Sequence, residues 1–301
     1  LLDTVTDETV RSFLDLITKP NGRRERYMNF LIVLCTSRGK GVRANQWRVC
    51  SMLFEDPTYR RLLLTLKLSP LASPSEHGRG RQQTNQRSAR SSIEGVSHEM
   101  GDTVTISGDA EFFPHLAGGA SDGLLLREWL DRTSPETLHY FERYLELLAV
   151  LCMGRNRKNT SLIRSLLPYD LVLSIITDKD LHVNHLQISQ RFVTLAHDVY
   201  LDAEPYEPMA TVRTVRIWAN VKRAADSHAL STRLTTSLNE KYPNWMERHN
   251  GLKRFILHFL GKYFKQTATD IKGNGMVLEL LKALFQLIYG GFYKADEISR
   301  D

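Results

Sequence analysis

Residues whose types could do chemistry occur in three places, and the first is a basic, glycine-rich stretch. Ser37-Arg38-Gly39-Lys40-Gly41 has the composition of a phosphate-binding loop. A P-loop, however, ends in Gly-Lys-Ser/Thr at a fixed spacing and follows a strand. This stretch lacks that ending and follows a predicted helix. We therefore interpret it as a tight turn between helices.

Three histidines form the second place. His182 and His185 lie close together, and His197 follows on the next predicted helix. Zinc-binding helices usually place two histidines four residues apart on one face, often with a Glu between them. No cysteine or suitably placed acid accompanies these histidines. We expect surface or capping roles for them and predict no metal ligand.

The third place is a set of three cysteines, Cys35, Cys50 and Cys152. They have no metal-site or redox-motif spacing, and each lies on an apolar helical stripe, where Cys behaves as a small hydrophobic residue. Serine-nucleophile elbows and paired acids are also absent from the sequence. We predict no catalytic residue, no cofactor and no enzymatic activity. Unpaired cysteines fit a reducing cytosolic location.

Charge and composition narrow the class of protein. The 301 residues carry a net charge of +6, which suits an anionic partner. The basic residues are spread along the chain without a recognised motif, so a mildly basic solvated surface is favoured over nucleic-acid binding. No apolar run reaches the length of a membrane span. The beginning, without Met or a signal pattern, indicates a piece of a longer protein.

Apolar periodicity places helices on both sides of a polar stretch. The composition shifts to Ser, Gly, Arg, Gln and Thr from Ser69 to about Ser121, and residues 75–92 carry no large apolar side chain. Such a segment cannot offset its ordering entropy, which predicts a disordered insertion with at most a brief strand at 103–106. Helices are predicted near 7–19, 27–35, 44–55, 58–67, 122–130, 134–153, 160–167, 169–177, 185–201, 212–221, 229–241, 244–266 and 276–289.

Helix after helix joined by short turns predicts an all-α fold. Consecutive antiparallel pairs favour an armadillo-like α-solenoid with a disordered insertion over a closed bundle. An irregular globular helical domain is the alternative. The predicted domains are helical repeats over 1–70, a basic Ser/Gln/Gly-rich disordered insertion over 71–121, and a continuing α-solenoid over 122–301.

The closing helix combines apolar residues at helical spacing with glycines at its end. We expect Leu281, Leu284 and Ile288 to face inward and Lys282 to lie on the opposite face. Phe292 is expected to fold back over the helix past the glycine turn.

Several stretches match a known family in order and spacing. Residues 22–35 form a basic-aromatic helix ending in Leu-Cys, and residues 41–46 add a short turn and an Asn-Gln helix start. This pair resembles the homology region shared by inositol trisphosphate and ryanodine receptors, the intracellular calcium-release channels. Residues 140–152, 168–171 and 211–218, and the closing helix with Gly291-Phe292-Tyr293, resemble the stretch that follows in the trisphosphate receptor.

The resemblance implies a mechanical role without ligand residues. In that family a β-trefoil and an adjoining helical domain hold the trisphosphate through basic residues, and the pore lies far towards the C-terminus. This chain resembles the regulatory segment between them, on the cytosolic face of the endoplasmic reticulum or a related calcium store. Such a segment relays ligand-driven domain motion towards the pore. The implied partners are other domains and subunits of a homotetrameric channel, together with regulatory proteins. A free-standing armadillo-like protein-interaction scaffold is the alternative function.

Overall fold

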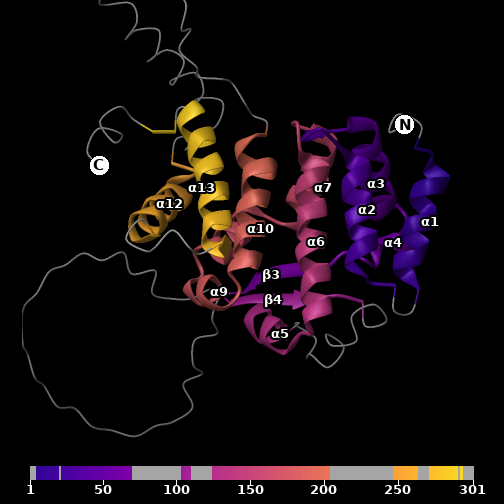
Figure 1. Cartoon of the computed structure of the whole chain (residues 1–301), viewed down its shortest axis with the longest axis horizontal. Coiled ribbons are helices and arrows are strands. Elements are labelled where there is room, and N and C mark those ends of the chain that lie inside the picture. The colour runs from indigo at the N-terminus through magenta and orange to yellow at the C-terminus, as the bar shows by residue number, and fades with distance from the viewer. Residues whose placement is uncertain are drawn as a thin grey trace, which may run out of the picture.

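The computed structural model describes residues 5–19, 22–69, 103–109, 124–203, 247–263, 271–290 and 292–293. Within these ranges the chain is mostly helical, as predicted, and its longer helices stand side by side in one row (Figure 1). Helix α2 packs on α6, α6 on α10 and α10 on α13, so the row is continuous. The solenoid itself stays a prediction. The row consists of α1 (Asp7–Thr18), α2 (Glu25–Cys35), α3 (Arg43–Glu55), α6 (Pro135–Cys152), α10 (Leu186–Ala196) and α13 (Ile271–Tyr289).

Shorter helices pack beside the helices of this row and at their lower ends in Figure 1. Helix α10 continues directly into a π-helical turn, η3 (His197–Leu201). In Figure 1 the strands lie at the lower ends of α10 and α6, with α5 and α9 beside them, and α12 lies beside α13. The remaining helices are α4 (Pro57–Arg60), α5 (Leu126–Arg132), α7 (Arg157–Leu166), α8 (Tyr169–Thr177), α9 (Lys179–Asn184) and α12 (Asn250–Tyr263).

Local caps start two of the row helices. The Thr6 hydroxyl accepts the N–H of Thr9 at 3.2 Å where α1 begins, and Ser134 accepts the N–H of Thr137 at 3.3 Å where α6 begins. These side chains satisfy N–H groups that the first turn of a helix leaves unpaired. The predicted start of α6 at Ser134 is confirmed.

A small antiparallel sheet corrects the prediction of an all-α fold. Strands β3 (Thr65–Ser69), β4 (Thr103–Ser107) and β5 (Leu124–Leu125) pair in the order β3-β4-β5. Leu66 pairs with Ile106, and both side chains are buried. Because the sheet packs against α5 and α8, its apolar side belongs to the main core.

The sheet affects the predictions for two segments of the chain, residues 58–67 and 71–121. The helix predicted over 58–67 ends at Arg60, and β3 follows. Strand β4 lies inside the stretch 71–121, at the place where the sequence allowed a brief strand over 103–106. Strands this short show little alternation of their own, and their pairing joins segments far apart in the chain. Residues 75–92 and the helices predicted over 212–221 and 229–241 lie outside the described residues.

Helix α6 is the centre of the core. It contacts α2, α3, α7 and α10, so nearly every side of it is covered. A helix that is apolar around most of its circumference is buried in this way. The fully or almost fully buried residues of α6 include Tyr140, Phe141, Tyr144, Leu145, Leu148, Leu151 and Cys152.

The closing helix buries a different face from the one predicted. Leu281 and Ile288 are 43 % and 45 % exposed, and Leu284 is only half-buried, so the expected inward stripe is wrong. The buried face is formed by Met276, Leu280, Ala283 and Leu287, each with no exposed surface. Apolar residues surround most of this helix, and packing against α10 selects which of them become buried.

The end of α13 follows the prediction. Phe292 donates its backbone N–H to the carbonyl of Leu287 at 2.9 Å, and its side chain is buried. Its ring lies edge-on against His249, with centroids 4.7 Å apart. A Cβ at Gly290 would come within 2.9 Å of the Phe292 ring, which explains the glycine at this turn. Lys282 is exposed, as predicted.

Candidate functional site: polar contacts across the helix row

The predicted tight turn at 37–41 is a two-strand hairpin. Strands β1 (Thr36–Ser37) and β2 (Lys40–Gly41) pair antiparallel, and Arg38 and Gly39 turn the chain with φ of 50° and 72°. This confirms the turn between α2 and α3.

The three histidines singled out in the sequence, His182, His185 and His197, occupy separate environments. His182 stacks on Phe255 of α12, with centroids 4.9 Å apart, so its expected surface position is wrong. His185 lies between α9 and α10, and its Nε2 is 2.8 Å from Oδ1 of Asp131. His197 begins η3. Across the described ranges, no cluster of three or more His, Cys, Asp or Glu residues could hold a metal ion.

The cysteines behave as core residues, as predicted. All three are buried and unpaired. Burial raises the pKa of Cys35 and Cys152 to about 12, and burial together with the neighbouring thiols raises the pKa of Cys50 further. Because the thiolate is the reactive form, these thiols are inert at neutral pH.

Polar side chains instead meet at three places between helices of the row, and the first is the C-terminus of α6. Gln46 of α3 is fully buried and donates its amide to the carbonyls of Val150 (2.7 Å) and Met153 (3.0 Å). Asn156 donates to Oε1 of Gln46 at 3.3 Å, and Asn159 of α7 donates to the carbonyl of Leu151 at 2.8 Å. We call Gln46, Asn156 and Asn159 the amide joint.

The amide joint completes hydrogen bonds that α6 cannot make internally. The last carbonyls of a helix have no intrahelical partner, and buried carbonyls need one. Gly41 permits the close approach, because a Cβ there would lie 2.2 Å from Nε2 of Gln46. Asn45, also buried, donates to the carbonyl of Leu34 at 2.8 Å. The Asn-Gln pair of the family resemblance therefore ties α3 to both α2 and α6.

A chain of ion pairs crosses the row from α2 to α10. Arg143 of α6 places Nε 3.0 Å from Glu25 of α2 and Nη1 2.6 Å from Glu146 on its own helix. The same Glu146 oxygen is 3.2 Å from Nη2 of Arg191 on α10. The hydrogen bond from Arg143 lowers the pKa of Glu25. We call these four residues the ion-pair chain.

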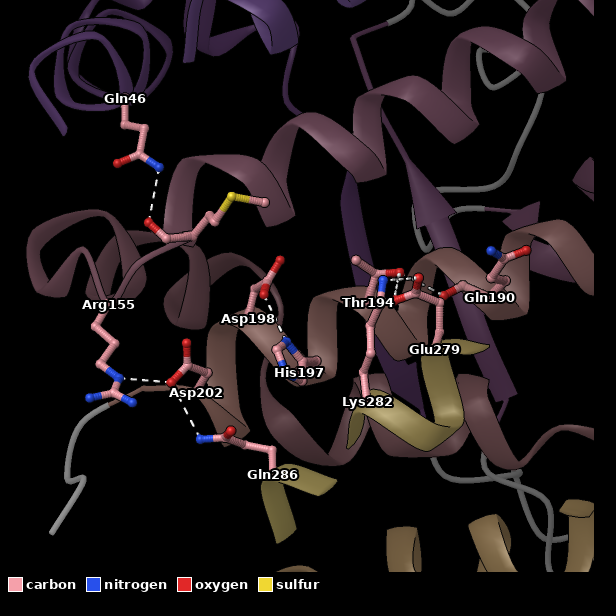
Figure 2. A network of polar contacts seen from close by, with 11 residues as sticks. Gln46, Arg155, Gln190, Thr194, His197, Asp198, Asp202, Glu279, Lys282 and Gln286 are labelled. Atoms are coloured by element: carbon pink, nitrogen blue, oxygen red, sulfur yellow. Dashed lines mark hydrogen bonds and ion pairs between the residues drawn. The ribbon is translucent and has the colours of Figure 1, made fainter. Parts of the chain in front are cut away.

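The third place joins α10 and η3 to α13 and to the turn after α6 (Figure 2). Oδ1 of Asp202 lies 2.7 Å from Nε of Arg155 and 3.3 Å from Nε2 of Gln286. Thr194 donates to Glu279 at 3.2 Å, and Lys282 binds the same carboxylate at 2.7 Å. We call these residues, together with His197 and Asp198, the charged joint.

His197 and Asp198 form the buried part of the charged joint. Nδ1 of His197 lies 2.8 Å from Oδ1 of Asp198, which is only 8 % exposed. Burial lowers the pKa of His197, but the hydrogen bond and negative charge of Asp198 outweigh burial, so the pKa of His197 is raised. Burial also raises the pKa of Asp198 despite the bond from His197. The π-helical turn presents both residues, and such turns often occur at functional sites.

These contacts can hold neighbouring helices in fixed positions relative to one another. Opposite charges and complementary amides lie across neighbouring helices, which holds the helices in register. Sequence reasoning missed all three places. One signal existed for Asp198, which follows Leu195 by three residues and therefore falls on the inward stripe of its helix. Gln46 and Arg143 carried no comparable signal, because their partners are distant in sequence.

A comparison with protein families supports the resemblance over the first part of the chain. Residues 1–67 match the family model of the RIH domain, the homology region of ryanodine and inositol trisphosphate receptors. The match covers α1 to α4 and includes Glu25 and Gln46. It supports a cytosolic region of a calcium-release channel, and the matched domain is one of channels rather than enzymes. Among the described residues no single helix is long and apolar enough to cross a membrane, although α7 and α8, bent by 66°, together pass that test by length and composition.

Proposed function

We propose that this chain is a relay segment of a ligand-gated intracellular calcium-release channel. It lies on the cytosolic face of the endoplasmic reticulum or a related calcium store, within a homotetramer. Its helices form an armadillo-like α-solenoid that passes ligand-driven domain motion towards the pore. The RIH match of residues 1–67 supports the channel family, and the contacts across the row support the relay.

The observation that carries the relay is the unbroken sequence of polar contacts along the row. The amide joint and the ion-pair chain tie the RIH-matching part to α6. Arg191 then connects α6 to α10, and the charged joint connects α10 to α13. Coupling between distant sites needs elements that move together, and each of these contacts resists sliding between two neighbours.

Hydrogen exchange on the chain itself tests whether the row responds as one unit. We expect Gln46→Ala to increase amide exchange in α10 and α13 as well as in α3 and α6. Gln187→Ala, at an exposed position of α10, is the matched control and should leave all four helices unchanged. An increase confined to α3 and the end of α6 would show that the helices respond separately.

The relay itself is tested in the full-length channel with a charge exchange. Arg155→Asp and Asp202→Arg each place like charges together, and the double variant restores an opposite pair. Each single variant should reduce ligand-evoked calcium release while leaving ligand affinity unchanged, and the double variant should recover part of the release. Arg60→Asp, at an exposed position of α4, is the control. Normal release by both single variants would exclude the relay, and an equal loss of ligand affinity would place the effect at the ligand site.

A further inference from the structure

Two turns meet at the C-terminal end of α6, and both carry exposed cations. One is the β1–β2 hairpin, and the other joins α6 to α7. Arg43 donates to the carbonyl of Gly154 at 3.2 Å, and a Cβ at Gly41 would lie 2.8 Å from the carbonyl of Met153, so the turns are in contact. We call this surface the basic double turn. Its exposed cationic residues are Arg38, Lys40, Arg43, Arg155, Arg157 and Lys158.

Acidic residues are scarce around these cations. The sequence has no Asp or Glu between Thr36 and Phe54 or between Leu147 and Tyr169. Within the described part of the chain, the ion pair with Arg155 brings Asp202 to this surface. Arg38, Lys40 and Lys158 are exposed and lie in these acid-free stretches, so they give this surface a positive charge.

The backbone holds an arginine at the tip of each turn. Arg38 and Arg155 have φ of 50° and 61°, and each lies beside a glycine of positive φ. Residues other than glycine seldom adopt this conformation. Lys158 extends over the ring of Trp47, with Nζ 4.9 Å from the centroid. Arg38 and Arg155 therefore lie on the turns themselves, and Arg43, Arg157 and Lys158 lie in the first turns of the helices that follow.

We propose that the basic double turn docks an extended acidic segment of a partner protein. A small anion would reach few of these side chains at once, whereas an extended Asp- and Glu-rich chain can contact cations on both turns. Arginine and lysine pair well with carboxylates in this way. The apolar residues of the turns, Val42 and Met153, are half-buried, so little is available to insert into a bilayer. Docking at this surface does not depend on channel activity or on the relay proposed above.

Fluorescence anisotropy with a labelled octaglutamate peptide tests this docking. At low ionic strength the chain should bind octaglutamate at least about tenfold more tightly than octaglutamine, and added salt should weaken the binding. The triple variant Arg38→Glu/Lys40→Glu/Lys158→Glu should lower the affinity for octaglutamate about tenfold or more. Arg43 and Arg155 are left in place because they hold the turns.

A control variant with the same change in net charge tests whether binding depends on the position of the cations or only on the total charge of the chain. Arg60→Glu/Lys67→Glu/Arg254→Glu changes the net charge equally at exposed positions elsewhere, and it should retain affinity within about twofold. Equal losses in both triple variants, or no preference for octaglutamate, would overturn the proposal. The proposal would also be overturned if octaglutamate failed to bind while the chain bound phosphatidylserine vesicles and the first triple variant abolished that vesicle binding. If circular dichroism shows that the glutamate variant unfolds, Arg38→Gln/Lys40→Gln/Lys158→Gln provides the same comparison.

Discussion

The amide joint and the charged joint connect neighbouring helices by opposite means. At the amide joint, neutral side chains satisfy buried backbone carbonyls, and the central residue, Gln46, is fully buried. At the charged joint, ionisable groups pair with one another, and several of them remain partly exposed. Arg155 and Asp202, for example, have side chains 43 % and 24 % exposed. The amide joint is therefore expected to hold one geometry under all conditions, while the charged joint should respond to salt and pH.

The largest expected effect concerns the packing beneath the charged joint. Leu280→Ala should lower the free energy of unfolding by about 2 to 5 kcal/mol, because its side chain is fully buried against the row. Leu281→Ala, at a position 43 % exposed, should cost less than about 1 kcal/mol. Urea unfolding of the two variants measures the difference. Equal costs would mean that the face of α13 assigned to the core is not the buried one.

Removing the centre of the amide joint should have the next largest effect. Gln46→Ala leaves the carbonyls of Val150 and Met153 without their side-chain donor, which should cost about 2 to 3 kcal/mol. Neutral groups are little screened, so the loss should be the same at low and high salt. Urea unfolding at two salt concentrations measures it, with Gln187→Ala as the exposed control. A loss that shrank in salt would contradict the neutral character of this joint.

A smaller effect is expected from the exposed pair of the charged joint. Asp202→Asn should cost less than about 1 kcal/mol, because solvent screens the partly exposed pair with Arg155. Unlike the loss at the amide joint, this loss should decrease as salt rises. Thermal unfolding across a salt series measures it. Arg155→Met, combined with Asp202→Asn in a double-mutant cycle, isolates the pair from the bond to Gln286.

The smallest expected effect is the contribution of His197 to the dependence of stability on pH. Because the pKa of His197 is raised above the ordinary value of 6.5, the folded state binds this proton more tightly than the unfolded state. The resulting stabilisation is complete below the ordinary pKa and is lost as pH rises through the raised value. The pKa of Asp198 is also raised, so the folded state binds this proton more tightly as well. Its contribution to stability is lost in the same direction, as pH rises above the ordinary value of 3.8.

Burial lowers the pKa of His182 and His249, and their contributions therefore rise with pH over the same range. We expect His197→Gln to remove a contribution that falls with pH, so the slope of stability against pH from pH 6 through neutral pH should become more positive. Thermal unfolding at a series of pH values measures the slope, and His258→Gln, on the exposed face of α12, is the control. An unchanged slope in His197→Gln would assign the pH dependence to other groups.

Local signals predicted the helices well and the contacts between them poorly. The start of α6 at Ser134 follows from its cap and is confirmed. The helix predicted near 185–201 is also present, as α10 and η3. The return of Phe292 over α13 followed from the glycine turn. The strand β3 was missed because its partner β4 lies far along the chain, and neither segment alternates strongly alone.

The positions of most helices follow from the amino-acid sequence alone, because caps and a 3.6-residue apolar period act between residues close together in the chain. The apolar face of α13 that becomes buried depends instead on packing, since Leu280 and Leu281 are equally apolar and Leu280 is the one buried where α13 packs against α10. The tertiary structure also decided the partners of Gln46, Arg143 and Asp202, because each partner comes from a distant segment. Burial and pairing depend on neighbours in space, and no local pattern specifies those neighbours.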